Sequence, residues 1–219
     1  MRVGADEAGK GPALGPMVAG AVRAAPEHLP EGLADSKKLS PARRRELNAA
    51  LRDHPEIRVA VAVVTPAEID APDTDMNSLG VAAQADAVAG VAEPGDEVYA
   101  DAADTDADRF GHRLADCLAE WNDALAGVAV TAAHGADESY PVVSAASVVA
   151  KVERDRLVTE IDAAYDRDVG SGYPSDPTTR AFLEGYVADH GALPDCARRS
   201  WSTCEDVLAA AEQSGLEEF

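Results

Sequence analysis

The chain has 219 residues, of which 46% are hydrophobic, and this size fits one α/β domain or one domain with a helical extension. Aspartate and glutamate number 40 against 19 lysines and arginines, which gives a formal net charge of -21 at pH 7. A charge of this sign ordinarily argues against nucleic acid as a partner.

The N-terminal part of the sequence predicts three strands and one helix. Arg2–Asp6 and Pro16–Val22 are β-compatible apolar runs, and the glycine-rich segment between them predicts a hairpin. Ser40-Pro41 is a favoured N-cap followed by a favoured first residue, so a helix is expected over residues 42–51. The alternating run Glu56–Thr65 predicts the third strand, and we expect all three strands to be antiparallel.

The rest of the sequence predicts alternating helices and strands. The expected elements are a short helix from Thr65-Pro66, a helix over Met76–Val91, a strand over Glu97–Asp101, a helix over Asp108–Leu125, a strand over Gly127–Ala132, a polar turn over His134–Glu138, a long helix over Val142–Tyr165, a helix from Asp176-Pro177 to His190 and a helix over Thr203–Glu212. Three strands followed by this alternation are consistent with a mixed five-stranded sheet flanked by helices.

The stretch Asp6–Pro16 places two adjacent carboxylates where the first strand meets a glycine- and proline-rich segment. Because adjacent side chains of a strand point to opposite faces, Asp6 and Glu7 share one ligand only if the chain turns or bulges there. Gly9 and Gly11 permit such a turn and leave the backbone open to a ligand. Carboxylate oxygens in this setting suit Mg²⁺ or Mn²⁺ beside a phosphate or a sugar.

Two other interpretations of this stretch stay open. An Asp-Glu pair in so acidic a chain is also compatible with a solvated turn. Gly4–Lys10 fits the pattern G-x-x-x-x-G-K of a phosphate loop, but the next residue is Gly11 rather than Ser or Thr. An NTPase is therefore kept as the alternative enzyme.

The whole stretch resembles the signature of the ribonuclease HII family, the type 2 ribonucleases H. That signature is a strand, then Asp-Glu-Ala-Gly-Arg-Gly-Pro and a Gly-Pro, and here Lys10 stands in the place of the arginine. The resemblance covers most of the chain and implies a ribonuclease H-like fold in which the first and fourth strands are parallel neighbours. It also implies a catalytic domain over residues 1–168 and a C-terminal helical extension over residues 169–219 that carries Gly172-Tyr173-Pro174.

The strand order implied by the family brings Asp6 and Asp101 to adjacent strand ends, where open α/β sheets place their ligands. The segment that follows the fifth strand resembles the family segment in which an aspartate precedes a Ser-Ala-Ala-Ser helix. By that match Asp137 is the fourth acid, with Glu138 and Asp155 as rival candidates.

Four carboxylates gathered at strand ends would repel one another unless cations neutralise them. Two divalent cations, Mg²⁺ or Mn²⁺, would allow in-line hydrolysis of a phosphodiester. The resemblance implies products with 5′-phosphate and 3′-hydroxyl ends. The expected catalytic residues and metal ligands are Asp6, Glu7, Asp101 and Asp137.

The resemblance also implies which residues read the substrate. In the family, the triplet that corresponds to Gly9-Lys10-Gly11 presents backbone groups to the 2′-hydroxyls around the cleaved phosphate, and this hydroxyl distinguishes RNA from DNA. Tyr173 matches the family tyrosine at the RNA-to-DNA junction sugar. The candidate phosphate contacts are Lys37, Lys38, Ser144, Ser147 and Lys151, although a solvated turn is the alternative for the lysine pair.

The lysines of this chain are few and lie inside these motif segments, namely Lys10, Lys37, Lys38 and Lys151. We interpret these positions as ones that need a compact ammonium donor for phosphate. The acidic, lysine-poor composition indicates adaptation to a salt-rich cytoplasm, as in halophilic archaea. In molar salt the Debye length falls to ~3 Å, which screens the self-repulsion of the surface.

We therefore predict a metal-dependent endoribonuclease that cuts the RNA strand of RNA–DNA hybrids and incises at ribonucleotides embedded in duplex DNA. An inactive hybrid-binding module with the same fold is the alternative that is not an enzyme. We expect a monomer without a membrane partner, with a sliding clamp as a weakly supported partner through Gly215–Phe219. The sequence shows neither a leader nor an apolar run of transmembrane length, and its three cysteines show no CxxC spacing, so we expect a cytoplasmic protein without disulfides.

Overall fold

A computed structural model of the chain describes residues 1–33 and 39–217, so the candidate phosphate contacts Lys37 and Lys38 lie outside the described residues. The helices and strands are β1 (Arg2–Ala8), β2 (Met17–Ala24), η1 (Pro26–His28), α1 (Pro41–Asp53), β3 (Arg58–Val64), α2 (Pro66–Ile69), α3 (Met76–Ala89), β4 (Glu97–Asp101), α4 (Ala107–Trp121), η3 (Asp123–Leu125), β5 (Ala129–Ala133), α5 (Ala136–Ser139), α6 (Pro141–Asp162), α7 (Pro177–His190) and α8 (Ser202–Glu217). In the part of the chain that the structure describes, no helix is both long and apolar enough to cross a bilayer.

The chain divides into two compact units. Unit 1 comprises Met1–Ala8, Val18–Val63 and Asp75–Arg154, and unit 2 comprises Gly9–Met17, Val64–Thr74 and Asp155–Phe219. Each unit is thus assembled from segments that are far apart in the sequence. Our division of the sequence between residues 168 and 169 stays a prediction.

Unit 1 is built on a mixed sheet of five strands in the order β3-β2-β1-β4-β5. β1 pairs antiparallel with β2 and parallel with β4, and β4 pairs parallel with β5. The predicted five-stranded sheet, the N-terminal hairpin and the parallel pairing of the first and fourth strands are therefore confirmed.

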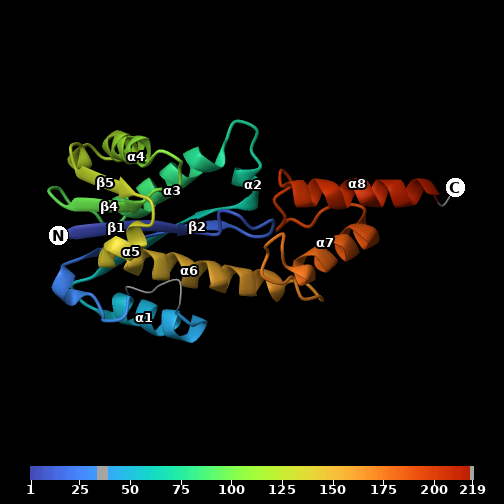
Figure 1. Cartoon of the computed structure of the whole chain (residues 1–219), viewed down its shortest axis with the longest axis horizontal. Helices are drawn as coiled ribbons and strands as arrows, with labels where there is room; N and C mark the ends of the chain where they lie inside the picture. The colour runs from blue at the N-terminus through green and yellow to red at the C-terminus, as the bar shows by residue number, and fades with distance from the viewer. Residues whose placement is uncertain (34–38, 218–219) are drawn as a thin grey trace. The chain divides into compact units, whose positions relative to one another are not determined.

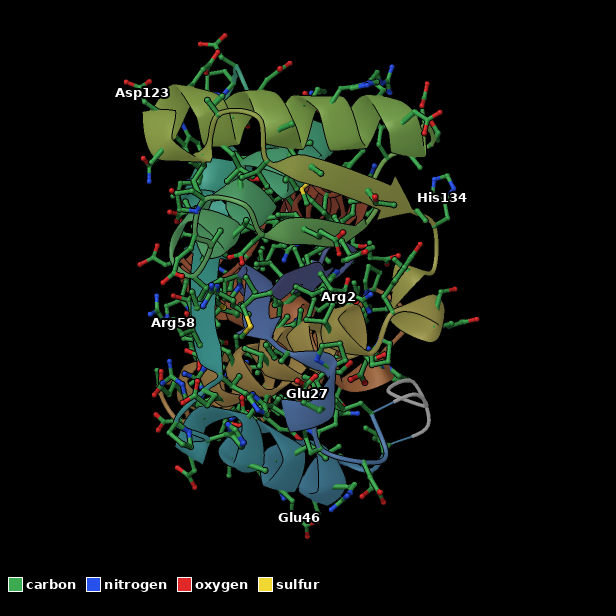
Figure 2. The ribbon with its side chains drawn as sticks, turned by 90° about the vertical axis from the view of Figure 1, so that its left-hand side faces the viewer. Arg2, Glu27, Glu46, Arg58, Asp123 and His134 are labelled. Atoms are coloured by element: carbon green, nitrogen blue, oxygen red, sulfur yellow. The ribbon has the colours of Figure 1, made fainter. Side chains whose placement is uncertain are left out.

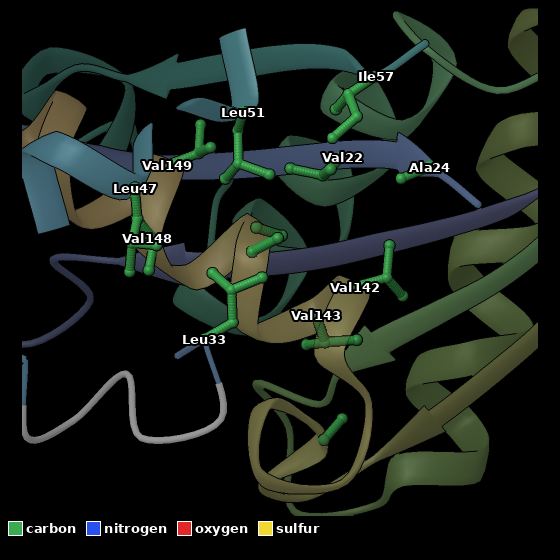
Figure 3. Close-up of a cluster of buried hydrophobic side chains, with 13 residues drawn as sticks. Val22, Ala24, Leu33, Leu47, Leu51, Ile57, Val142, Val143, Val148 and Val149 are labelled. Carbon is green, nitrogen blue, oxygen red and sulfur yellow. The ribbon is translucent and has the colours of Figure 1, made fainter. Parts of the chain in front are cut away.

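Helices cover both faces of this sheet (Figure 1), with α3 and α4 on one face and α1 and α6 on the other. Figure 2 shows the same layers from the side, with Asp123 of η3, which follows α4, and Glu46 of α1 on opposite sides of the strands. Between α1, α6 and the sheet lies a cluster of buried aliphatic side chains (Figure 3). Its members include Val22, Leu47, Leu51, Val143 and Val149.

Two glycines allow α6 to lie directly on the sheet. A Cβ atom at Gly4 of β1 would lie 2.2 Å from the carbonyl oxygen of Val142, and one at Gly20 of β2 would lie 2.7 Å from the carbonyl oxygen of Ala146. No side chain tolerates such distances, so the backbone of α6 approaches these strands only where the sheet carries glycine. The contact at Gly20 fixes the turn of α6 that lies beside Asp6, because Asp6 is the ladder partner of Gly20.

The helices begin where the sequence predicts them. The side chain of Ser40 accepts a hydrogen bond from the Arg43 N–H, Thr65 forms a capping box with Glu68, and the Asp176 carboxylate accepts from the Thr178 N–H. These side chains satisfy N–H groups that the first helical turn leaves unpaired.

Several predicted bounds after β4 are wrong. The helix predicted to reach Leu125 ends at Trp121, because the side chain of Asn122 caps a separate 3₁₀ turn by accepting from the Ala124 N–H. The polar turn predicted over His134–Glu138 contains the short helix α5, which the chain enters through Gly135 at φ 65°.

The two C-terminal bounds also differ from the prediction. The long helix predicted to reach Tyr165 ends at Asp162, whose carboxylate accepts a hydrogen bond from the Val169 N–H at 2.9 Å. The last helix was expected to stop at Glu212, and α8 instead continues to Glu217.

Unit 2 has its own apolar core around α7 and α8. Phe182 and Leu183 of α7 and Cys204 of α8 are buried in it together with Leu14, which lies in the loop that follows β1. That loop is therefore part of a packed core and not an isolated surface segment.

Replacing Gly20 tests how much the close approach of α6 to the sheet contributes to stability. We expect Gly20→Ala to lower the free energy of unfolding by about 1–3 kcal/mol, because the added methyl group must displace helix backbone. Gly80→Ala in α3 is the matched control, since its Cβ would lie 3.4 Å from the nearest atom and alanine favours helix. Urea unfolding of both variants in molar KCl measures the difference, and a Gly20→Ala variant as stable as the wild type would contradict this account.

Candidate active site

Asp6 and Glu7 both lie within β1, and their side chains point to opposite faces of the sheet. The ladder with β2 continues through both residues to Ala8, and the chain turns only at Gly9, where φ is 86°. The turn or bulge expected at the two acids is therefore displaced to the glycine. As a consequence, a different helix holds each carboxylate.

Asp6 is 5% exposed and is held by α6. Its carboxylate hydrogen-bonds to the Ser147 hydroxyl, and the Lys151 ammonium donates to the Ser147 oxygen at 2.7 Å. Burial, followed by repulsion from Glu7, raises the pKa of Asp6 above its ordinary value. Repulsion from Asp101 acts in the same direction, while Ser147 and Lys151 partly oppose it. The protein thus keeps a desolvated acid beside two other acids.

Glu7 is held from the opposite face by Gln84 of α3. The side-chain amide of Gln84 donates to Glu7 Oε2 at 2.6 Å and to the backbone carbonyl oxygen of Asp101 at 2.9 Å. Gln84 is fully buried, so it connects β1 to β4 inside the protein. Our sequence analysis missed this residue, and the available signal was a single glutamine in an otherwise apolar stretch of helix.

Asp101 and Asp137 come together at the end of β4. Asp101 is the last residue of this strand, and its Oδ1 accepts a hydrogen bond from the Ala136 N–H at 2.8 Å. The next residue, Asp137, is 4% exposed, and the Ser144 hydroxyl of α6 donates to its carbonyl oxygen. The short helix α5 therefore begins at the residue that binds Asp101, and its second residue is a buried acid.

The two rivals for the fourth ligand lie in different surroundings. Glu138 is exposed on α5, and Asp155 is exposed on α6 and belongs to unit 2. Asp137 is instead buried, and it directly follows Ala136, whose N–H binds the Asp101 carboxylate. This placement supports Asp137 as the proposed fourth ligand.

These acids offer only carboxylate oxygens, which is the donor set that hard divalent cations prefer. A cation would also relieve the repulsion that raises the pKa of Asp6. Within residues 1–33 and 39–217, no three acidic, histidine or cysteine side chains yet surround one point.

Three of the candidate phosphate contacts support the acids in the structure. Ser144 and Ser147 are 1% and 0% exposed, and their hydroxyls are engaged with Asp137 and Asp6. Lys151 is half-buried and reaches Asp6 through Ser147. These residues lie on one face of α6, where Ser147 and Lys151 support the carboxylate of Asp6 and Ser144 binds the backbone of Asp137.

In unit 2, the glycine loop (residues 9–16) meets the loop that carries Tyr173. A Cβ atom at Gly11 would lie 4.0 Å from the ring of Tyr173, and the Ala13 N–H donates to the Gly172 carbonyl oxygen at 2.8 Å. Tyr173 is 41% exposed, so its ring is accessible from solvent beside the loop. The structure thereby brings together two segments that the sequence analysis assigned to substrate reading.

The phosphate-loop alternative is wrong. The first five residues of the candidate loop, Gly4–Ala8, lie in β1, where the strand is paired on both sides. A phosphate loop follows its strand and turns its N–H groups toward the anion. Because Gly4–Ala8 are hydrogen-bonded within the sheet, they do not form a loop of this kind.

The raised pKa of Asp6 predicts that Asp6→Asn stabilises the metal-free protein at neutral pH. Because the folded state binds this proton more tightly than the unfolded state does, stability is lost as the pH rises from 3.8 through the folded pKa. Asparagine removes the buried charge, so the gain is largest at neutral pH and shrinks as the pH falls.

Thermal unfolding with EDTA in molar KCl measures this gain. Asp155→Asn, which changes an exposed acid, is the matched control and should leave the midpoint unchanged. An Asp6→Asn variant that is less stable than the wild type at neutral pH would contradict the prediction.

Comparison with known proteins agrees with this geometry. A family model described as ribonuclease HII matches residues 3–204. Ribonucleases HII from the halophilic archaea Halobacterium salinarum and Haloarcula marismortui are each 56% identical, and the alignments cover 100% of this chain and 99% and 100% of theirs. Ribonuclease H2 from Pyrococcus horikoshii is 35% identical, with a TM-score of 0.85 over 97% of this chain and 99% of that one. Ribonuclease HII from Archaeoglobus fulgidus, solved in complex with PCNA, is 35% identical, with a TM-score of 0.81 over 94% of this chain and 96% of that one. The chain therefore belongs to the ribonuclease HII family.

Proposed function

We propose that this ribonuclease HII, a metal-dependent endonuclease acting on RNA–DNA hybrids and on ribonucleotides embedded in duplex DNA, uses four carboxylates to hold two divalent cations, Mg²⁺ or Mn²⁺. The observation that carries the proposal is the parallel pairing of β1 with β4, which is in register up to Ala5 and Ala100. The next residue of each strand is an acid, so both acids lie at one edge of the sheet. The proposed ligands are Asp6, Glu7, Asp101 and Asp137.

The surrounding residues hold these carboxylates in place. Gln84 fixes one oxygen of Glu7, and the Ala136 N–H fixes one oxygen of Asp101. Ser147, supported by Lys151, orients Asp6. Bound cations would activate the attacking water and stabilise the leaving 3′-oxygen. The task of the protein is therefore to keep four like charges close together until the cations neutralise them.

The glycine loop and Tyr173 supply the proposed recognition of the substrate. The triplet Gly9-Lys10-Gly11 offers backbone groups to the ribose 2′-hydroxyl, and the exposed ring of Tyr173 lies beside Gly11 for contact with the junction sugar. Lys10 and the pair Lys37-Lys38 are proposed as cations for the phosphates, the pair on sequence alone.

A sliding clamp is a further proposed partner, because the relative from Archaeoglobus fulgidus was solved in complex with PCNA. The candidate segment Gly215–Phe219 ends in two residues that the structure does not describe, so this assignment rests on the sequence and the relative. A monomeric state likewise stays a prediction.

The catalytic assignment is tested by single exchanges of the acids. Asp137→Asn should reduce cleavage of a duplex with one ribonucleotide by orders of magnitude, because the amide loses the charge that holds a cation. The same loss is expected for Asp6→Asn, Glu7→Gln and Asp101→Asn. Exposed Asp155 provides the matched control Asp155→Asn, which should remain active.

The assay uses a labelled duplex with Mg²⁺, Mn²⁺ or EDTA across a salt series. If Asp137→Asn cleaves like the wild type while Asp155→Asn does not, the fourth ligand is Asp155. If the wild type binds the duplex but never cleaves it, the chain is an inactive hybrid-binding module.

Tyr173 is expected to matter more for junctions than for long hybrids. Tyr173→Ala should lower kcat/KM at a single ribonucleotide roughly tenfold more than within a long hybrid, which corresponds to about 1.4 kcal/mol of lost contact. Tyr173→Phe keeps the ring and should retain the wild-type ratio. Steady-state kinetics on both substrates measure this ratio. An equal loss of kcat/KM on both substrates would argue against a junction role.

A further inference from the structure

The buried guanidinium of Arg198 hydrogen-bonds to the backbone of the glycine loop at three positions. Arg198 lies between α7 and α8 in unit 2 and is 0% exposed. Its side chain donates to the carbonyl oxygens of Gly9 at 2.6 Å, of Lys10 at 2.9 Å and of Gly15 at 2.9 Å. Burial of a charged group is costly, and the flat, rigid fork of arginine matches several fixed acceptors at once. The loop backbone thus supplies the acceptors for a buried cation.

Trp201 extends this arrangement. Its indole N–H donates to the Gly11 carbonyl oxygen at 3.2 Å, and its ring centroid lies 4.9 Å from the guanidinium carbon of Arg198. The backbone N–H of Arg198 also donates to the Ala13 carbonyl oxygen at 2.8 Å. We call Arg198 and Trp201 the carbonyl clamp, since together they bind the carbonyl oxygens of Gly9, Lys10, Gly11, Ala13 and Gly15.

The carbonyl clamp also determines where the N–H groups of the loop point. In a trans peptide, the carbonyl of one residue and the N–H of the next point in opposite directions. Because the clamp binds the carbonyls of Gly9 and Lys10, it turns the N–H groups of Lys10 and Gly11 away from itself. The bound carbonyls of Gly11 and Gly15 instead precede prolines, which have no N–H. The N–H that follows the Ala13 carbonyl belongs to Leu14 and donates to the Gly172 carbonyl oxygen at 3.2 Å. The two other donors that the clamp orients are those of Lys10 and Gly11, and Gly11 is exposed.

We propose that the carbonyl clamp is a positioning device that presents the N–H groups of Lys10 and Gly11 to the ribose 2′-hydroxyl and the adjacent phosphate. Backbone N–H groups of fixed direction bind such oxygens without the entropy cost that a flexible side chain pays. The positive φ of Gly9 lets the loop turn its carbonyls inward at its first residue. This inference rests on the proposed function of the glycine loop and assigns the control of its shape to Arg198.

The test compares the affinity for a duplex with one ribonucleotide with the affinity for the same duplex made of DNA alone, in EDTA. Arg198→Lys keeps the charge but cannot reach three carbonyls, so we expect the ratio of the two affinities to fall about tenfold, the effect of two misplaced hydrogen bonds. Exposed Arg199 gives the matched control Arg199→Lys, which should keep the wild-type ratio.

Trp201→Phe removes the indole donor but keeps an aromatic ring, and it should lower the ratio by about threefold, the effect of one lost hydrogen bond. This variant decides the question if Arg198→Lys does not fold. A purely structural role for the carbonyl clamp would lower the thermal midpoint and kcat but leave the ratio unchanged, and that result would overturn the proposal. A wild type without preference for the ribonucleotide would overturn it as well.

Failure of the proposed function is recognised separately. A wild type that does not cleave the ribonucleotide duplex with Mg²⁺ or Mn²⁺ contradicts the enzymatic assignment. A wild type that cleaves, together with Arg198→Lys that keeps the affinity ratio, contradicts the carbonyl clamp alone.

Discussion

The direct contact between the backbone of α6 and the sheet is the constraint on which unit 1 depends. It exists because Gly4 and Gly20 leave no side chain between the helix and the strands. At this short separation the small hydroxyl of Ser147 reaches the carboxylate of Asp6. A longer separation would require a longer polar side chain, which has more rotamers to restrict. The same contact buries Asp6, and this burial raises the pKa of Asp6 more than the repulsion by Glu7 and Asp101 does.

The acids are supported from two sides of one sheet. The face of α6 holds Asp6, whereas Gln84 of α3 holds Glu7 and the end of β4. Strand alternation makes this division unavoidable, because neighbouring residues of β1 face opposite layers. The result is a charged edge that is well oriented but unfavourable in isolation. The buried charge costs stability, a compromise that is common at enzyme sites.

The sequence predicted most of the fold for local reasons. Caps such as Ser40-Pro41 and the hairpin glycines act within a few residues, while the strand order came from the family resemblance. Gln84 and Arg198 were missed because their roles arise only from contacts across 77 and 189 residues. Ser147 was recognised from its motif, but the structure shows its hydroxyl turned inward to an acid.

The sequence distance between the carbonyl clamp and its loop has a consequence for biosynthesis. Gly9 is made 189 residues before the arginine that binds its loop. All four proposed metal ligands have been translated well before Arg198. A nascent or prematurely terminated chain can therefore carry the four acids while its loop lacks the fixed backbone directions that we propose for reading the ribose. The proposed selectivity is therefore completed only after the proposed metal ligands have been made.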